Sequence, residues 1–139
     1  MLKKILLAIA LTFPVSNLIA LDTEFQCLAN NVYHEARGES KAGKIAVALV
    51  TLNRVESDKF PKTICGVVYQ RHQFSWTTTV KKFNVDDKQW RESVDAAMQA
   101  YMNRDSLGYF KAKYFHAKSV NPGWKLHKVA TIGQHVFYK

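Results

Sequence analysis

The chain has 139 residues, of which 47% are hydrophobic and 22% charged. This composition is that of a globular protein and excludes a low-complexity or repetitive chain. One domain of this length buries a core without metal or disulfide support. The formal net charge of +9 favours a polyanionic partner, whether nucleic acid, anionic lipid or an acidic cell-wall polymer, and does not choose among them.

Residues 1–20 have the pattern of a secretory leader. The cationic start MLKK precedes the apolar run ILLAIALTFPVSNLIA, which Pro14 interrupts. We expect a signal peptide that is cleaved after Ala20, or else an uncleaved N-terminal membrane segment. Without the leader's two lysines the domain at 21–139 keeps a charge of +7. Because exported proteins rarely bind nucleic acid, we predict no nucleic-acid partner and a periplasmic or extracellular location.

The first predicted helix begins at Thr23, where Gln26 three residues later completes a capping box. Gly38 is the expected end, because glycine takes the left-handed conformation at little cost. Between these two signals, apolar side chains recur at helical spacing and predict the buried face of the helix. They are Phe25, Leu28, Ala29, Val32, Tyr33 and Ala36.

Glu35 lies on the same side of this helix as Leu28 and Val32, because it follows them by seven and three residues. A carboxylate on a core-facing side is partly removed from water, which disfavours its charged form and raises its pKa. A carboxylic acid of raised pKa can still hold a proton near neutral pH, as a general acid must. The alternative is a structural ion pair of Glu35 with Arg37 or another cation.

The neighbours of Glu35 do not form a metal site. His34 suggests zinc, but the metalloprotease pattern requires a second histidine where the chain has Gly38. The other histidines show no metal-ligand spacing, so we predict neither a metal nor a cofactor. Glu39 is a weaker acid candidate, since an acid beside the Ser40 cap also suits the positive end of the next helix. The remaining histidines are His72, His116, His127 and His135.

The second predicted helix begins after Ser40 and covers KAGKIAVALVTLNRV, residues 41–55. It is apolar on almost every side, so we expect it to run through the middle of the domain. A short helix is expected from Thr63. Cys65, just beyond Thr63, is one of only two cysteines, and in an oxidising compartment it could pair with Cys27; two buried thiols are the alternative.

The stretch HQFSW, residues 72–76, places an amide, a hydroxyl and two aromatic rings in a predicted loop. Such a set suits a sugar, because an aromatic face stacks on a pyranose ring while Gln73 and Ser75 bond its hydroxyl groups. The alternative is a loop that Phe74 and Trp76 anchor in the core.

The sequence of the last third of the chain predicts one more helix, followed by a change from helical to β-type residue spacing. Asp86 or Asp87 caps the helix. Beyond Gly108, YFKAKYFHA alternates with β period, NPGW is a turn, and VATIGQHVFYK is expected to be one closing strand. We therefore predict a single α+β domain, mainly α, with a small late β-element. The buried stripe of its third helix is expected to be Trp90, Val94, Ala97, Met98 and Tyr101.

Seven of these stretches, in this order, resemble the cell-wall hydrolase family typified by the spore-cortex-lytic enzymes of the SleB/CwlJ type. They are NNVYHEARGES, GKIAVALVTLNRV, FPKTICGVVYQ, QFSW, YFHA, NPGW and TIGQHVFYK. The resemblance covers Leu28 to the C-terminus. It implies a lysozyme-like fold related to lytic transglycosylases, peptidoglycan as partner, and cleavage of the β-1,4 bond between N-acetylmuramic acid and N-acetylglucosamine.

The resemblance also assigns roles to residues. The acid of the family's YxEARGE motif falls on Glu35, and the motif's second acid falls on Glu39, to which we give a supporting role. Substrate-binding positions fall on Gln73, Ser75, Trp76 and His116. We expect a monomer with a single-acid, transglycosylase-type reaction, and residues 1–20 allow a transient association with the membrane. The alternative function is a non-catalytic envelope protein that binds peptidoglycan.

Overall fold

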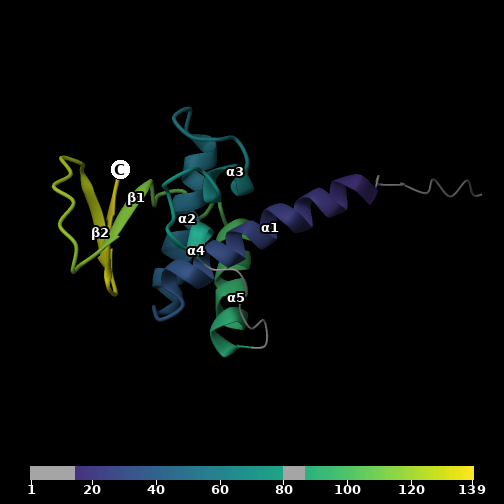
Figure 1. The fold of residues 1–139 in the computed structure, drawn as a ribbon, viewed down its shortest axis with the longest axis horizontal. Helices are drawn as coiled ribbons and strands as arrows, with labels where there is room; N and C mark the ends of the chain where they lie inside the picture. The colour runs from purple at the N-terminus through teal and green to yellow at the C-terminus, as the bar shows by residue number, and fades with distance from the viewer. Residues whose placement is uncertain (1–14, 80–86) are drawn as a thin grey trace, which may run out of the picture.

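The computed structural model describes residues 15–79 and 87–139. Within these ranges helices come first along the chain and a small antiparallel sheet comes last (Figure 1). Most of the predicted leader, residues 1–14, lies outside the described residues, so its cleavage stays a prediction. No helix in the described ranges combines the length and the apolar character that a membrane span requires.

Helix α1 runs from Val15 to Ala36. It therefore begins eight residues before Thr23, and the predicted capping box at Thr23 is wrong, because no glycine or proline between 15 and 22 interrupts the helix. The predicted left-handed glycine at its end is also wrong: Gly38 is not among the residues of positive φ. The predicted buried face is confirmed, with Phe25 partly buried and the other five side chains buried.

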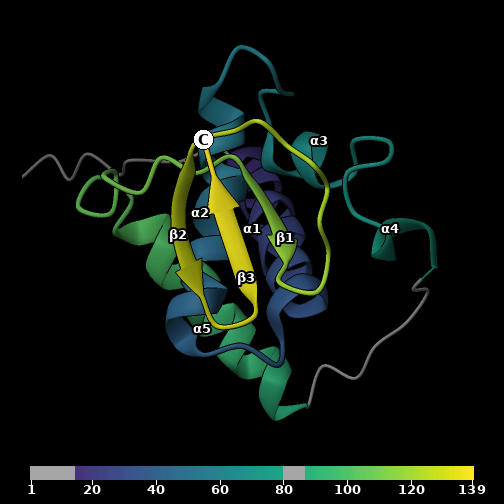
Figure 2. The same ribbon diagram turned by 90° about the vertical axis from the view of Figure 1, so that its left-hand side faces the viewer.

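Helix α2 (Lys41–Glu56) lies at the centre of the domain, as predicted. The Ser40 side chain accepts a hydrogen bond from the Gly43 amide at 3.3 Å, which caps the helix. Most of α2 is buried, and the helix packs against α1, α5, α3 and the sheet. In Figure 2 the sheet lies in front of α2, so one helix supports elements on opposite sides.

A disulfide joins the first helix to α3 (Ile64–Val68), which settles the choice left open by the sequence. Cys27 and Cys65 are bonded, with their Cα atoms 5.2 Å apart. The Thr63 hydroxyl caps α3 by accepting the Gly66 amide at 3.0 Å. Glu24 of α1 accepts the Cys65 amide at 3.1 Å, so the covalent link is supported by hydrogen bonds beside it.

Helix α5 (Lys88–Met102) begins at an Asp87 cap, whose side chain accepts the Gln89 amide at 2.8 Å. The alternative cap, Asp86, lies outside the described residues. Trp90 and Ala97 are buried and Val94 is partly buried, but Met98 and Tyr101 are 40% and 38% exposed, so the predicted stripe is wrong at these two positions. Small side chains let α5 approach α1 and α2 closely, and the buried face turns toward them: Ser93, Ala96, Ala97 and Ala100.

The sheet contains β1 (Tyr114–Ala117), β2 (Lys128–Ile132) and β3 (His135–Tyr138) in the order β1-β3-β2, all antiparallel. The predicted single closing strand is wrong, because the chain reverses at Gly133, which takes a φ of +56°. Phe137 of the central strand is fully buried and contacts Phe110 edge-on, which fixes the sheet against the helices. A short helix that the sequence analysis did not predict, α4, covers Trp76–Thr79.

Candidate active site

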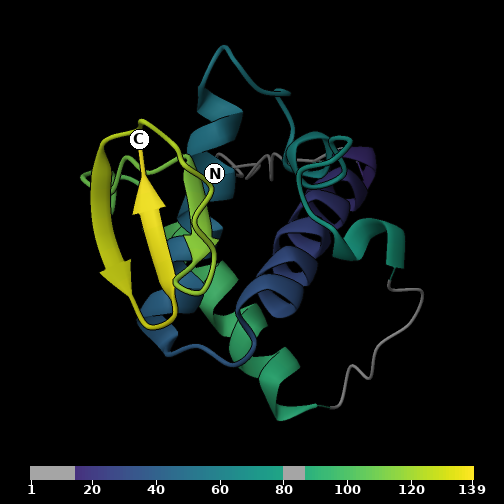
Figure 3. The ribbon, with the colours of Figure 1, turned by 60° about the vertical axis from the view of Figure 1, so that its left-hand side comes forward.

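Two adjoining pockets form one cleft between the helical part of the domain and the β-element. Their volumes are about 720 and 1080 Å³. The residues that line the pockets place the loop before α4 in one wall, and β1 with the long loop that follows it in the other. Figure 3 shows where these segments run in the ribbon. Six residues line both pockets and mark the place where they meet: Glu35, His72, Gln73, Phe74, His116 and Val120.

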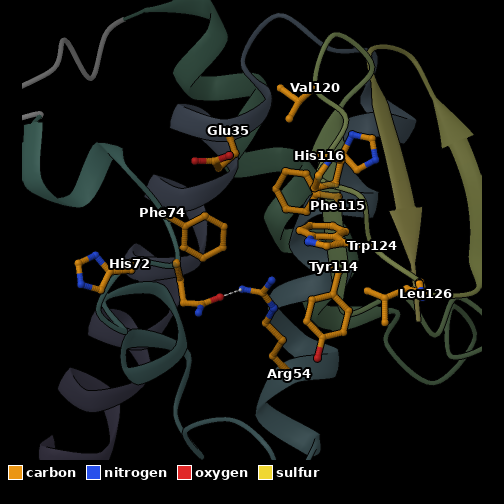
Figure 4. A pocket seen from close by; sticks show the side chains of 13 residues that line it. Glu35, Arg54, His72, Phe74, Tyr114, Phe115, His116, Val120, Trp124 and Leu126 are labelled. Carbon is orange, nitrogen blue, oxygen red and sulfur yellow. Dashed lines mark hydrogen bonds between the residues drawn. The ribbon is translucent and has the colours of Figure 1, made fainter.

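Glu35 lies in the last turn of α1 and projects into this cleft (Figure 4). Burial raises its pKa to about 7, against a smaller opposing effect of the Arg54 charge. No hydrogen bond or ion pair joins its carboxyl group to any residue in the described ranges. Arg37 instead lies over the Tyr33 ring, 5.4 Å from its centre, so the alternative of a structural Glu35–Arg37 pair is not what the fold forms. Glu35 is also the only carboxylate among the described residues that line the two pockets.

Arg54 is a buried cation at the base of the cleft, only 5% exposed. Its Nε donates to the Lys113 carbonyl at 2.7 Å, and its Nη1 donates to Oε1 of Gln73 at 3.2 Å. The guanidinium also lies over the rings of Phe74 and Tyr114, at 5.4 and 5.8 Å from their centres. Because Gln73 and Lys113 come from opposite walls, Arg54 ties the two walls together through α2.

The predicted sugar-binding loop divides into two kinds of residue. Gln73 and Ser75 are exposed at the cleft, Gln73 in both pockets and Ser75 in the larger one. Phe74 is buried, and Trp76 donates from its indole nitrogen to Asn31 at 3.0 Å. The Trp76 ring also stacks on His34, with centroids 4.4 Å apart, and it lines neither pocket. Phe74 and Trp76 therefore have the surroundings of loop anchors, as the alternative interpretation expected.

His116 belongs to an aromatic group on the β wall. Its Nδ1 lies 2.8 Å from the Ala117 carbonyl, to which it must donate, so the neutral ring accepts the Tyr138 hydroxyl at Nε2, 2.9 Å away. Trp124, 41% exposed, meets the rings of Tyr114, His116 and Tyr138 edge-on. This packing holds Trp124 at the side of the cleft, where it is a pocket-lining residue together with His116.

Glu39 lies outside the cleft. Its Oε2 accepts the backbone amide of Gln134 at 3.0 Å, across the turn between β2 and β3. A side chain at Gly133 would clash with this carboxylate, so the absence of a Cβ there makes room for it. Glu39 thus joins the end of the segment that carries Glu35 to the β-hairpin.

Several cleft residues were missed by the sequence analysis, namely Arg54, His72, Tyr114, Phe115 and Trp124. Arg54 had a recognisable signal, since a charged residue inside an otherwise apolar central helix needs a reason to be there. His72 has a φ of +65°, which is uncommon for a residue other than glycine and places strain at the cleft. The β-wall residues had no local signal, because only the tertiary fold brings them opposite Glu35.

Comparisons with known proteins agree on one family. A family model described as Cell Wall Hydrolase matches residues 38–138. The chain is 33% identical over 123 residues to a spore cortex-lytic enzyme of Oceanobacillus iheyensis, covering 84% of this chain and 41% of that protein. It is 32% identical over 117 residues to a spore cortex-lytic enzyme of Bacillus cereus, covering 84% of this chain and 44% of that protein. The chain therefore spans less than half of the length of these relatives.

Two solved structures share the fold over most of the chain. One is the catalytic domain of the germination-specific lytic transglycosylase SleB from Bacillus anthracis, with a TM-score of 0.70 and 31% identity, covering 84% of this chain and 93% of that one. The other is the catalytic domain of the Bacillus cereus SleB protein, with a TM-score of 0.72 and 30% identity, covering 85% and 91%. The prediction of a mainly helical, lysozyme-like domain with a late β-element is confirmed.

Proposed function

The chain belongs to the cell wall hydrolase family, and from that membership we propose that it is a peptidoglycan-degrading enzyme of the lytic transglycosylase type. Its proposed target is the β-1,4 bond between N-acetylmuramic acid and N-acetylglucosamine in the cell envelope. The observation that carries the proposal is that the carboxyl group of Glu35, whose pKa burial raises, lies in the cleft without a hydrogen-bond or ion-pair partner among the described residues.

In the proposed reaction, protonated Glu35 donates its proton to the glycosidic oxygen. The bond between that oxygen and C1 of the muramic acid breaks, and N-acetylglucosamine leaves with a free hydroxyl group. Positive character at C1 is then quenched by the C6 hydroxyl of the same sugar, whose proton passes to the Glu35 carboxylate. This internal attack leaves a 1,6-anhydro end, whereas attack by water would give hydrolysis.

Ordinary glycosidases place a second carboxylate across the scissile bond from the acid. In the described parts of the chain, Glu35 alone supplies a carboxylate to the cleft lining. A single-carboxylate mechanism is therefore favoured. Glu39 supports the reaction by holding the β-hairpin rather than by touching the sugar, since its carboxylate is committed to the Gln134 amide.

The test is digestion of purified sacculi by residues 21–139. We expect the turbidity of the suspension to fall and soluble muropeptides to appear, with 1,6-anhydro ends in their mass spectra, each lighter by one water than a reducing end. Reducing ends would replace the transglycosylase mechanism by hydrolysis. Binding to sacculi without any soluble product would contradict the enzymatic proposal and leave a non-catalytic envelope protein.

Arg54 tunes the acid, so the pH profile of activity tests its role. Activity should fall as pH rises above about 7, because the donor must be protonated and burial raises the Glu35 pKa to about 7. Arg54→Met removes the charge that opposes this rise, so the alkaline limb should move to higher pH while the maximal rate falls. Arg54→Lys, which keeps a positive charge, should leave the limb near its wild-type position; an unmoved limb in the methionine variant would contradict the coupling.

A further inference from the structure

The charge of the molecule is unevenly distributed along the chain. No aspartate or glutamate follows Asp105, whereas six lysines do, so residues 106–139 carry six of the nine net positive charges. This segment forms the whole β-element and the loops around it. Like charges gathered on a small element repel one another, and an anionic ligand would relieve that repulsion.

Four of these lysines are exposed and form no ion pair with a described residue: Lys118, Lys125, Lys128 and Lys139, which we call the lysine surface. In the described ranges, the ion pairs involve cations of the helical part and its loops, and none involves the lysine surface. The other two lysines differ, since Lys111 and Lys113 line a small pocket together with Glu56 and Asp58. Among the described residues, the lysine surface is therefore the part of the β-element that has no acidic partner.

The lysine surface flanks the β wall of the cleft at both ends. Lys118 directly follows β1, and its amide donates to the Gln134 carbonyl at 2.8 Å, beside the larger pocket that Ala117 lines. At the other end Lys125 itself lines the smaller pocket. Lys128 lies opposite Tyr138 in the strand register, and the amide of Lys139 donates to the His127 carbonyl at 2.9 Å, which brings these two lysines to the same end of the sheet.

We propose that the lysine surface binds the carboxylates of the stem peptides on peptidoglycan, so that the enzyme prefers peptide-bearing glycan to bare glycan. This inference rests on the proposed function. A glycan strand is uncharged along its amino-sugar backbone apart from the peptides that hang from its muramic acids. A strand lying along the β wall would bring peptides on successive muramic acids toward the lysines at the two ends. Charge complementarity at the rim of a cleft sets specificity and encounter rate more than it adds buried contact.

The test compares two variants of equal charge change in the full-length protein. The first replaces Lys118, Lys128 and Lys139 with glutamine and leaves Lys125 in place, because Lys125 lines the cleft. The control replaces Lys41, Lys59 and Lys62, three exposed lysines of the helical part that line neither pocket of the cleft. Both are made in a Glu35→Gln background for binding, so that sacculi are not digested during sedimentation.

The probes are purified sacculi and the same sacculi after their free peptide carboxylates have been converted to neutral amides with a carbodiimide and ethanolamine, which leaves the cross-linked network intact. On untreated sacculi in low salt, the first variant should bind roughly tenfold more weakly than its parent, and the difference should shrink in high salt. On amidated sacculi the two should bind alike. An equal loss in the control variant, an equal loss on amidated sacculi, or no loss at all would each overturn the proposal.

Two further measurements separate this inference from the proposed function. Wild-type protein is assayed for soluble products on both kinds of sacculus, and a failure on both would refute the cleavage proposal while the binding comparison still reports on the lysine surface. Vesicles of anionic phospholipid are the second probe. Loss of vesicle binding in the first variant, with sacculus binding unchanged, would assign the surface to lipid and overturn the assignment to stem peptides.

Discussion

Glu35→Gln is expected to lower the release of soluble fragments from sacculi by roughly 10²–10⁴-fold, the usual contribution of a general acid. Glutamine has nearly the same shape as glutamic acid but cannot give up a proton to the glycosidic oxygen. Since no described residue bonds the Glu35 carboxyl group, the substitution breaks no hydrogen bond or ion pair within the described part of the chain. The measurement is a turbidity assay of the wild type beside the variant. Near-wild-type activity of the variant would show that a residue other than Glu35 is the general acid.

The same variant provides its own control for folding, because its stability should depend on pH differently from that of the wild type. In the folded protein the pKa of Glu35 is raised from 4.5 to about 7, so between these values the native state holds a proton that the unfolded chain releases. Wild-type stability therefore falls as pH rises through that window, and it stays lower above it. Glutamine does not titrate, so the variant should gain melting temperature over the wild type at pH 8 and much less at pH 4.5.

Glu39→Gln separates the two acids. It should retain most of the activity and lose about 1 kcal/mol of stability, because an amide oxygen accepts the Gln134 amide less strongly than a carboxylate does. A loss of activity as large as that of Glu35→Gln would contradict the single-carboxylate mechanism and place Glu39 in the chemistry.

Replacing both cysteines with serine should cost about 4 kcal/mol of unfolding free energy, the entropy of closing a loop of this length in the unfolded chain. The two residues are 38 apart in sequence, and the link holds α3 against α1. We expect the melting temperature to fall by roughly 10–15 °C. Thermal unfolding followed by circular dichroism, with and without a reductant, measures both effects.

The comparison with reductant decides whether the bond itself is responsible. Reduced wild type and the double serine variant should unfold at similar temperatures, and the reductant should leave the variant unchanged. If reduction leaves the wild type as stable as before, the link between Cys27 and Cys65 contributes little, and the hydrogen bonds of Glu24 to α3 hold the two helices instead.

Much of the helical part was predictable because its signals are local. The apolar spacing around Leu28 and Val32, the Ser40 and Thr63 caps and the uniformly apolar second helix all reappear in the fold. The predictions failed where tertiary packing, rather than local spacing, determined which side chains are buried. Met98 has the right spacing for a core position, but the small residues of α5 turn a different face inward.

The candidate site was only half predictable for a related reason. Glu35 can be found from the sequence, because a charged residue type occupies a position where the helical spacing predicts a buried apolar side chain. Tyr114 and Trp124 show no such conflict, because an aromatic residue is ordinary in a β-like segment, as at Tyr114, and at the end of a turn, as at Trp124. Their place opposite Glu35 depends on a hairpin whose turn at Gly133 the sequence pattern does not separate from one continuous strand.

The bond between Glu39 and the Gln134 amide spans 95 positions of the chain. Glu39 follows the proton donor Glu35 by four residues. Gln134 belongs to the turn of the β2–β3 hairpin, whose strand β3 pairs with β1. Thermal motion of the β-element is therefore coupled to the segment that carries Glu35, so the two sides of the cleft move together and the width that a sugar must fit is kept. Glu39 would thus set the width of the cleft without contacting the glycan.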